Sequence, residues 1–235
     1  MKAVFLRELK AYFNSPLIYI LMSLFLIVSF VFYLMYNILN QYASMMPVMY
    51  SINTMLLFLV PMLTMRLFSE EKTQRTDQLL FTSPNSITSL VMGKFLSAFA
   101  VFVIIMSVVL IYALITAIFG SLDFASFLIM FIGELLIGAS FVAVGLFVSS
   151  VSTNLIISAL VSFALLLVFY FSEMIPGMFG NPEWLVKFFS FFSLSYRFDN
   201  FGMGLLAWDS IFYYISFAGI FIFLTIRMID KKRWS

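Results

Sequence analysis

Long apolar runs are the feature that most limits what this chain can fold into. A helix needs about 20 apolar residues to cross a hydrocarbon core of about 30 Å. Six runs reach or approach that length, at residues 17–36, 48–65, 95–119, 127–148, 155–171 and 211–226. Only 10% of the residues are charged, against about 25% in soluble domains. We therefore expect an all-α membrane protein with six transmembrane helices and a single domain over residues 1–235.

Basic residues are distributed unevenly between the two ends of these predicted spans. All of the 13 lysines and arginines except Lys187 and Arg197 fall on the side that holds both termini and the connection between spans 2 and 3. Positive charge collects on the cytosolic side of membrane proteins. We expect a multi-pass protein of the cytoplasmic (plasma) membrane with both termini in the cytosol.

Residues 1–15 have a helical pattern of their own. The basic residues of this segment lie away from one helical face. The large apolar side chains follow the spacing of that face, and they are Phe5, Leu6, Leu9, Tyr12 and Phe13. This pattern predicts an N-terminal interfacial helix on the cytosolic surface. Two interpretations stay open, simple anchoring in the membrane and an elbow that bears on the neighbouring spans.

Residues 173–209 form an unusually apolar loop between spans 5 and 6. Pro176 and Gly177 break the chain, and Asn181-Pro182-Glu183 is a helix-start signal followed by many aromatic residues. Aromatic residues favour the membrane interface. We expect short extracellular helices here that form a re-entrant loop in the outer leaflet.

The most polar segment is the connection at residues 66–94. Six of the 24 charged residues lie within residues 66–77, namely Arg66, Glu70, Glu71, Lys72, Arg75 and Asp77. Ser69 is a potential N-cap and Pro84 a potential stop, which predicts a short cytosolic helix between spans 2 and 3. The alternative is an ordinary solvated loop.

Several kinds of chemistry are absent from the sequence. The chain has no cysteine and no histidine, and it lacks the glycine-rich phosphate loop of many ATPases. We therefore expect no enzyme activity, no metal and no cofactor in this chain. Membrane lipid is an expected partner, and nucleic acid is not.

One acidic residue lies well inside a predicted span. Glu134 is costly at that depth unless it is protonated, paired or hydrated. In the functional interpretation it lines a translocation path or contacts a partner subunit. In the structural interpretation it packs near one end of a tilted helix, with a hydrogen bond to a neighbour. Gly138 and Gly145 in the same run let helices approach closely, and packing within the bundle is favoured over a dimer seam.

Three segments resemble a known family. They are FSEEKTQRTDQLLFTSP at 68–84 with LVMGKFL at 90–96, GLFVSSVSTN at 145–154, and the closing region 198–204 with 224–234. Together they resemble ABC-2-type transporter permeases, in a branch resembling the gliding-motility-associated ABC permease subunit. Arg75 replaces the glycine that is usual there, and Gln78 replaces a common glutamate.

The resemblance implies a half-transporter, the membrane-spanning subunit of an ATP-binding cassette exporter. ATP and Mg would bind a separate ATPase subunit, docked on a coupling helix in the 66–84 loop, against which residues 5–13 would bear. A second permease subunit would complete a homodimer or heterodimer. The implied docking residues are Glu70, Glu71, Lys72, Arg75, Thr76 and Asp77.

Other functions remain possible from the sequence. The first alternative is a non-transporting membrane scaffold or sensor subunit that recruits an ATPase. A lipid-modifying enzyme is disfavoured because cysteine and histidine are missing. The apolar spans suit a lipid-like or amphipathic cargo and suit core packing equally well, so the substrate stays open.

Overall fold

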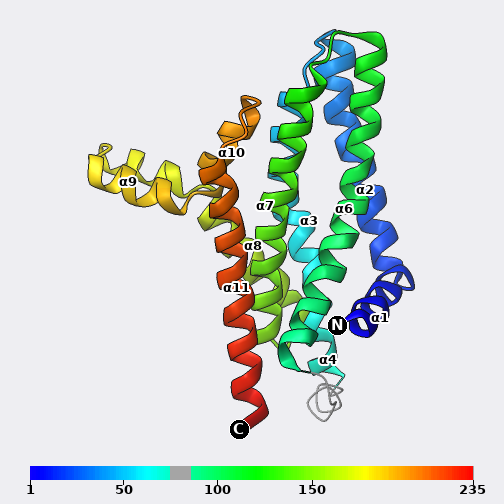
Figure 1. Cartoon of the computed structure of the whole chain (residues 1–235), viewed down its shortest axis with the longest axis vertical. Coiled ribbons are helices and arrows are strands. Elements are labelled where there is room, and N and C mark those ends of the chain that lie inside the picture. The colour runs from blue at the N-terminus through cyan, green and yellow to red at the C-terminus, as the bar shows by residue number, and fades with distance from the viewer. Residues whose placement is uncertain (75–85, 235) are drawn as a thin grey trace.

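The structure is a computed structural model that describes residues 1–74 and 86–234. Every regular element in these two ranges is a helix, and most of the long helices stand side by side in one elongated bundle (Figure 1). The predicted all-α class is therefore confirmed.

The helices follow one another with short connections. In chain order they are α1 (Lys2–Phe13), α2 (Pro16–Tyr33), η1 (Leu34–Leu39), α3 (Met46–Thr64), α4 (Arg66–Thr73), α6 (Ile87–Phe119), α7 (Phe124–Val151), α8 (Leu155–Tyr170), η2 (Ser172–Phe179), α9 (Glu183–Phe192), α10 (Leu194–Gly202) and α11 (Trp208–Trp234). Helix η1 is a π-helix that continues α2, and η2 is a 3₁₀-helix.

Five helical stretches in the described ranges are long and apolar enough to cross a membrane. A sixth is reached only if α8 and η2 count as one span, because these two helices meet at a bend of 60°. Helix α8 alone has 16 residues, which is short for a crossing. The sequence predicted six spans, and the described residues contain five, or six if α8 and η2 form one span across the bend after Tyr170.

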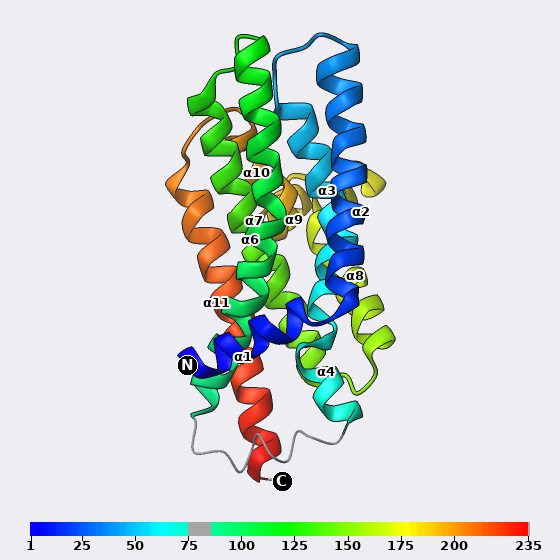
Figure 2. The ribbon, with the colours of Figure 1, turned by 90° about the vertical axis from the view of Figure 1, so that its right-hand side faces the viewer.

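The bundle has two different ends. We call the end that holds α1, α4 and the connection between α7 and α8 the lower end, as it is drawn in Figure 1. The upper end holds the connections at residues 40–45 and 120–123. Both chain termini lie toward the lower end, where α1 crosses the bundle at a steep angle to α6 (Figure 2). Helix α9 projects sideways from the bundle (Figure 1).

Helix α7 is the centre of the bundle and contacts α3, α4, α6, α8, α10 and α11. Its glycines allow this close packing. A Cβ atom on Gly138 would collide with the ring of Phe102 in α6, and one on Gly145 would collide with the side chain of Thr64 in α3. The small residues of α7 therefore serve packing within the bundle, as the sequence favoured.

The expected short helices between the last two spans are present as η2, α9 and α10. Helix α9 has no buried residue, and its aromatic side chains Trp184, Phe188 and Phe191 are largely exposed. Helix α10 instead packs inward, where Phe201 lies directly over Gly133 of α7.

Candidate functional site

A short helix, α4, lies in the segment where the sequence predicted a coupling helix, and it follows α3 almost without a break. Helix α3 ends at Thr64 and α4 begins at Arg66. The sequence predicted a start at Ser69, and this detail is wrong, because Ser69 lies inside α4 and is fully buried. The reason is that the start of α4 is capped by a side chain from another helix.

That cap is Ser149, near the end of α7. Its hydroxyl oxygen accepts hydrogen bonds from the backbone N–H groups of Phe68 at 2.9 Å and Ser69 at 3.1 Å. The same hydroxyl lies 3.1 Å from the carbonyl oxygen of Met65, to which it donates. The first turn of a helix leaves N–H groups without helical partners. Ser149 satisfies two of them and joins α4 to α7.

The rest of α4 is held by contacts in which side chains of α4 donate to backbone carbonyls at the end of α7. The Nζ of Lys72 donates to the backbone carbonyls of Ser150 and, at 3.1 Å, Ser152. The last carbonyls of a helix lack helical partners and carry partial negative charge, so a lysine there is favourable. Thr73 adds a hydrogen bond of 2.8 Å to the carbonyl of Thr153. Helix α4 and the lower end of α7 are thus held together.

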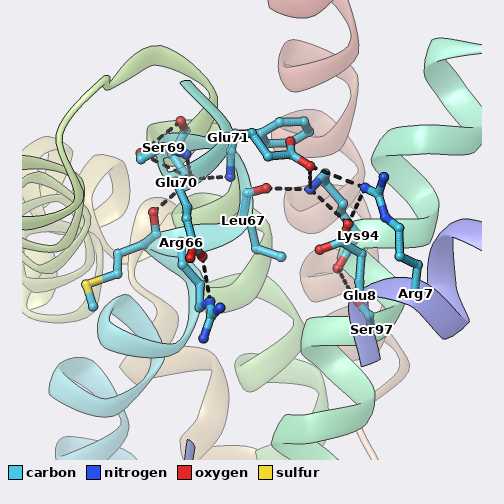
Figure 3. Close-up of polar contacts among 12 residues, drawn as sticks. Arg7, Glu8, Arg66, Leu67, Ser69, Glu70, Glu71, Lys94 and Ser97 are labelled. Atoms are coloured by element: carbon cyan, nitrogen blue, oxygen red, sulfur yellow. Dashed lines mark hydrogen bonds and ion pairs between the residues drawn. The ribbon is translucent and has the colours of Figure 1, made fainter. Parts of the chain in front are cut away.

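A buried lysine joins α4 to two further helices. Lys94, in α6, is 1% exposed, and its Nζ donates to the carbonyl of Leu67 at 2.6 Å. It also forms ion pairs with Glu71 of α4 at 2.9 Å and with Glu8 of α1 at 3.2 Å (Figure 3). The ring of Phe68 lies 5.0 Å from this ammonium group. A lysine so deeply buried requires such partners.

Helix α1 completes the arrangement. Arg7 bonds to Glu8 at 2.6 Å and to Glu71 at 3.2 Å. Tyr12 is buried and donates its hydroxyl to the carbonyl of Leu63 at the end of α3, 3.0 Å away. We call Glu8, Glu71, Lys94 and Ser149, with these contacts, the polar joint.

The charges of the polar joint shift the ionisation of Glu8. Burial by itself would raise the pKa of this carboxyl. Lys94 and Arg7 outweigh burial and hold the pKa of Glu8 below its ordinary value. Glu8 is therefore ionised at neutral pH and available to Lys94.

A pocket of about 280 Å³ opens beside the polar joint, between α1 and α4. Three of the predicted docking residues lie in or near it. Glu70 lines it and pairs with Arg66 at 2.9 Å, with 35% of its side chain exposed. Glu71 lines it from within the polar joint, and Lys72 turns away to α7. The other three, Arg75, Thr76 and Asp77, lie outside the described residues.

Sequence analysis missed Glu8, Lys94 and Ser149 as members of a site. Glu8 shares the inward face of α1 with the buried residues Val4 and Tyr12, spaced four apart. Lys94 is a charge within a long apolar helix, which is a usable signal. Ser149 gave no signal beyond its place in the segment 145–154, because its cap joins residues 80 positions apart in the sequence.

The other predicted polar residue, Glu134, is fully buried in α7. Neither carboxylate oxygen has a hydrogen-bond partner among the described residues. The hydrogen-bonded packing that the sequence allowed is therefore not seen there. Asn53 in α3 is likewise fully buried with both amide atoms unpaired in the described part of the chain.

Within the described residues, no group of three or more acids is placed to hold a metal ion. The polar joint is built from ion pairs and caps between helices. Such an arrangement can transmit force between helices.

This geometry defines a class of protein, the polytopic helical membrane proteins, here with a charged end whose helices are joined by ion pairs and hydrogen bonds. A comparison with protein families matches residues 48–229 to the family described as ABC-2 family transporter protein. The match covers more than half of the chain, and the protein belongs to this family. It is thus a membrane permease component of an ABC transporter, a kind of subunit that works with an ATPase subunit. No curated protein matches the chain.

Proposed function

We propose that the protein is the permease subunit of an ABC exporter in the branch resembling the gliding-motility-associated permease. It moves substrate across the cytoplasmic membrane with energy from ATP that a separate ATPase subunit hydrolyses. ATP and Mg bind that partner, and this chain is not itself an enzyme. A second permease subunit, identical or different, completes the transporter.

The lower end of the bundle faces the cytosol in this proposal. Lys2, Arg7 and Lys10 of α1 and Arg66 and Lys72 of α4 all lie at this end. That charge distribution agrees with the rule that basic residues stay on the cytosolic side. Helix α1 then lies in the inner interface, and α9 and the rest of residues 173–209 lie at the outer leaflet.

Helix α4 is the coupling helix, and the ATPase docks on it and on the residues that follow. The side chain of Glu70 is 35% exposed, about twice the exposed fraction of Glu71, and it lines a pocket that a partner side chain can enter. Glu71 and Lys72 contribute by fixing α4 to the bundle. Arg75, Thr76 and Asp77, which lie outside the described residues, are further docking residues in this proposal.

The single observation that carries this proposal is the position of Lys94. Its ammonium group contacts α1 and α4 at once while its backbone belongs to α6. Ser149 ties the same α4 to α7. A displacement of α4 by the ATPase therefore reaches three other helices through short polar contacts. ATP binding to the partner shifts the conformational equilibrium of the permease only if these contacts differ in free energy between the conformations of the permease.

Glu134 belongs to the translocation path in this proposal. Thr64 packs against Gly145 across α3 and α7. Asn53 and Glu134 each lie 11 residues earlier in the same two helices, which run in the same direction. Eleven residues are about three helical turns. The side chains of Asn53 and Glu134 therefore lie at the same height, on the faces of α3 and α7 that face each other. Separation of α3 and α7 would expose both as a polar lining.

The experiment that tests the proposal is reconstitution with the partner ATPase in liposomes. The permease function requires that the pair hydrolyses ATP faster when substrate is present and that substrate accumulates on the far side. The scaffold or sensor alternative gives ATPase binding without transport. A set of candidate amphipathic cargoes, tested one by one, keeps the two outcomes distinct.

A further inference from the structure

A groove between α1 and α6 takes no part in the polar joint. It measures about 660 Å³, and its walls come from residues 1–5 and from one face of α6 between Leu96 and Ile104. Apart from Lys2, every residue that lines the groove has an apolar side chain. Such walls favour a hydrocarbon chain over water.

Two contacts hold α1 in place across α6 and so give the groove its shape. At Gly93 the two helices are so close that a Cβ atom on this glycine would lie 2.9 Å from Cγ1 of Val4. At the next residue of α6, Lys94 pairs with Glu8 at 3.2 Å. Both contacts come just before the α6 residues of the groove, so α1 closes its lower end and leaves the side of α6 beyond it open.

The groove lies at the level where lipid head groups and lipid tails meet. The apolar run of α6 that we expect to span the membrane begins at residue 95, so residues 96–104 are the first turns of this span. They extend over about 12 Å of the helix axis, at a rise of about 1.5 Å per residue. A lipid whose head group lies beside α1 therefore has its tail along these residues.

Lys2 is the only charged residue that lines the groove, and its side chain is exposed. Glu8 is the only acidic residue of α1 and α6, and it is already paired with Arg7 at 2.6 Å and with Lys94. No ion pair within the described residues includes Lys2. The long stem of a lysine can follow an apolar surface while its ammonium group reaches the head-group level. The groove thus combines apolar walls with one cation that has no carboxylate partner.

We propose that this groove binds an anionic phospholipid. The phosphate of the lipid pairs with the ammonium group of Lys2, and one acyl chain lies along Leu96, Ala100 and Ile104. A zwitterionic lipid brings its own cation close to Lys2, which weakens the pairing of its phosphate. This inference goes beyond the proposed function, because it needs only that the lower end of the bundle lies at one of the two membrane surfaces.

A phospholipid fits this groove better than a protein does. The pocket at the polar joint is lined by charges of both signs, as suits a protein side chain. The groove offers a single cation above a wholly apolar surface, and an anionic head on a hydrocarbon tail is complementary to that pattern. A second copy of the chain in the groove is an outcome that the test detects.

The test uses the full chain in nanodiscs of phosphatidylcholine that contain a small share of a photoreactive lipid. Two probes carry the same diazirine-bearing acyl chain, one on phosphatidylglycerol and the other on phosphatidylcholine. Labelling of residues 1–5 and 96–104 is mapped by mass spectrometry.

Two pairs of variants accompany the unaltered chain. Lys2→Gln removes the charge, and Lys10→Gln, which is also exposed on α1 but lies outside the groove, is its matched control. Ala100→Phe fills the groove, and Ala117→Phe, at an exposed position near the other end of α6, is its matched control.

The site predicts that the phosphatidylglycerol probe labels these residues about fivefold more than the phosphatidylcholine probe, as one lysine near an anionic lipid allows. Lys2→Gln removes this preference and Lys10→Gln keeps it. Ala100→Phe lowers the labelling by both probes, and Ala117→Phe leaves it unchanged.

Equal labelling by the two probes overturns the proposal, and this comparison needs only the unaltered chain. A preference that survives Lys2→Gln, or that both lysine variants lose alike, also overturns it, because general attraction to a basic surface then explains the result. Labelling that survives Ala100→Phe, or a crosslink to a second copy in place of lipid, overturns it as well.

Discussion

Lys94 Nζ and Glu71 Oε1 lie 2.9 Å apart and join two helices that meet only at the lower end of the bundle. The lysine belongs to the long span α6, and the glutamate belongs to the short helix α4. Glu8 of α1 shares the same ammonium group at 3.2 Å. One buried positive charge therefore holds three elements at the end where we place the ATPase.

Removal of the Lys94 charge tests this arrangement. We expect Lys94→Met to lower the free energy of unfolding by about 3 kcal/mol, because it breaks a buried ion pair and leaves two carboxylates facing each other. ATP hydrolysis by the complex should then lose its response to substrate while the ATPase stays bound. Unfolding in mixed micelles and ATPase assays in liposomes measure the two effects.

The matched control is Lys187→Met, whose pair with Glu183 spans 3.9 Å and whose side chain is 81% exposed. An exposed ion pair contributes about 0–1 kcal/mol, so this change should be nearly neutral. Equal behaviour of the two variants would remove Lys94 from the mechanism.

Reversal of charge at Glu70 tests docking. We expect Glu70→Lys to weaken binding of the ATPase about tenfold. The new positive charge in the interface would face either a positive charge of the ATPase or no partner charge at all. Stability should change little, because the pair with Arg66 is partly exposed. Titration of the purified ATPase against nanodisc-held permease gives the affinity. Glu183→Lys on α9 is the control, and a Glu70→Lys protein that binds as tightly as this control contradicts docking at α4.

The cap made by Ser149 gives a third prediction. Ser149→Ala leaves the N–H groups of Phe68 and Ser69 buried without an acceptor, which costs about 1–3 kcal/mol. Helix α4 should then exchange its amide hydrogens faster than the rest of the bundle. Ser23→Ala in α2 removes a hydroxyl that bonds only within its own helix and serves for comparison. Unchanged exchange in α4 would mean that Ser149 does not hold it.

The ionisation of Glu8 predicts a dependence on pH. Its pKa is lower in the folded protein than in the unfolded chain, so its stabilising effect is complete above the ordinary glutamate pKa of about 4.3. The effect is lost as the pH falls through the lower folded-state pKa. Thermal unfolding should show Glu8→Gln less stable than the unaltered protein at neutral pH. The difference should shrink below about pH 4, and a gap that persists there would show that charge at Glu8 is not its cause.

Glu134 gives a prediction about transport. Glu134→Leu replaces an unpaired buried carboxyl with an apolar group, so it should stabilise the closed packing of α7 while slowing transport. Glu134→Gln keeps a polar group and should transport faster than the leucine variant. Comparison of transport with thermal unfolding separates the two effects. A leucine variant that transports normally would make Glu134 a packing residue only.

The sequence predicted the helical class and the places of most spans, because long apolar runs have few other stable structures in a membrane. It was less reliable at α8, where the same apolar composition continues past Tyr170 although the backbone bends by 60°. Local signals also predicted short helices after residue 172, and α9 starts at Glu183, directly after Asn181-Pro182.

The polar joint was harder to predict, for a physical reason. Periodicity and capping rules describe contacts within a few residues. Lys94 and Glu8 are 86 positions apart, and Ser149 caps a helix that begins more than 80 residues earlier. The charges in residues 66–77 predicted a functional surface in this segment, but they did not predict that Glu71 pairs with the buried Lys94. Only the packing of α1, α4, α6 and α7 decides this.

The absence of cysteine allows a direct measurement of the central claim. Gln74→Cys, at the end of α4, would carry the only thiol of the chain. A maleimide that bears a photoreactive benzophenone would attach to this thiol and, on irradiation, link it to a bound partner in native membranes. We predict capture of a polypeptide that a photoreactive ATP analogue also labels, with no such product from Glu183→Cys on α9. If Gln74→Cys never captures an ATP-binding polypeptide while its thiol is fully modified, α4 is not where the motor acts.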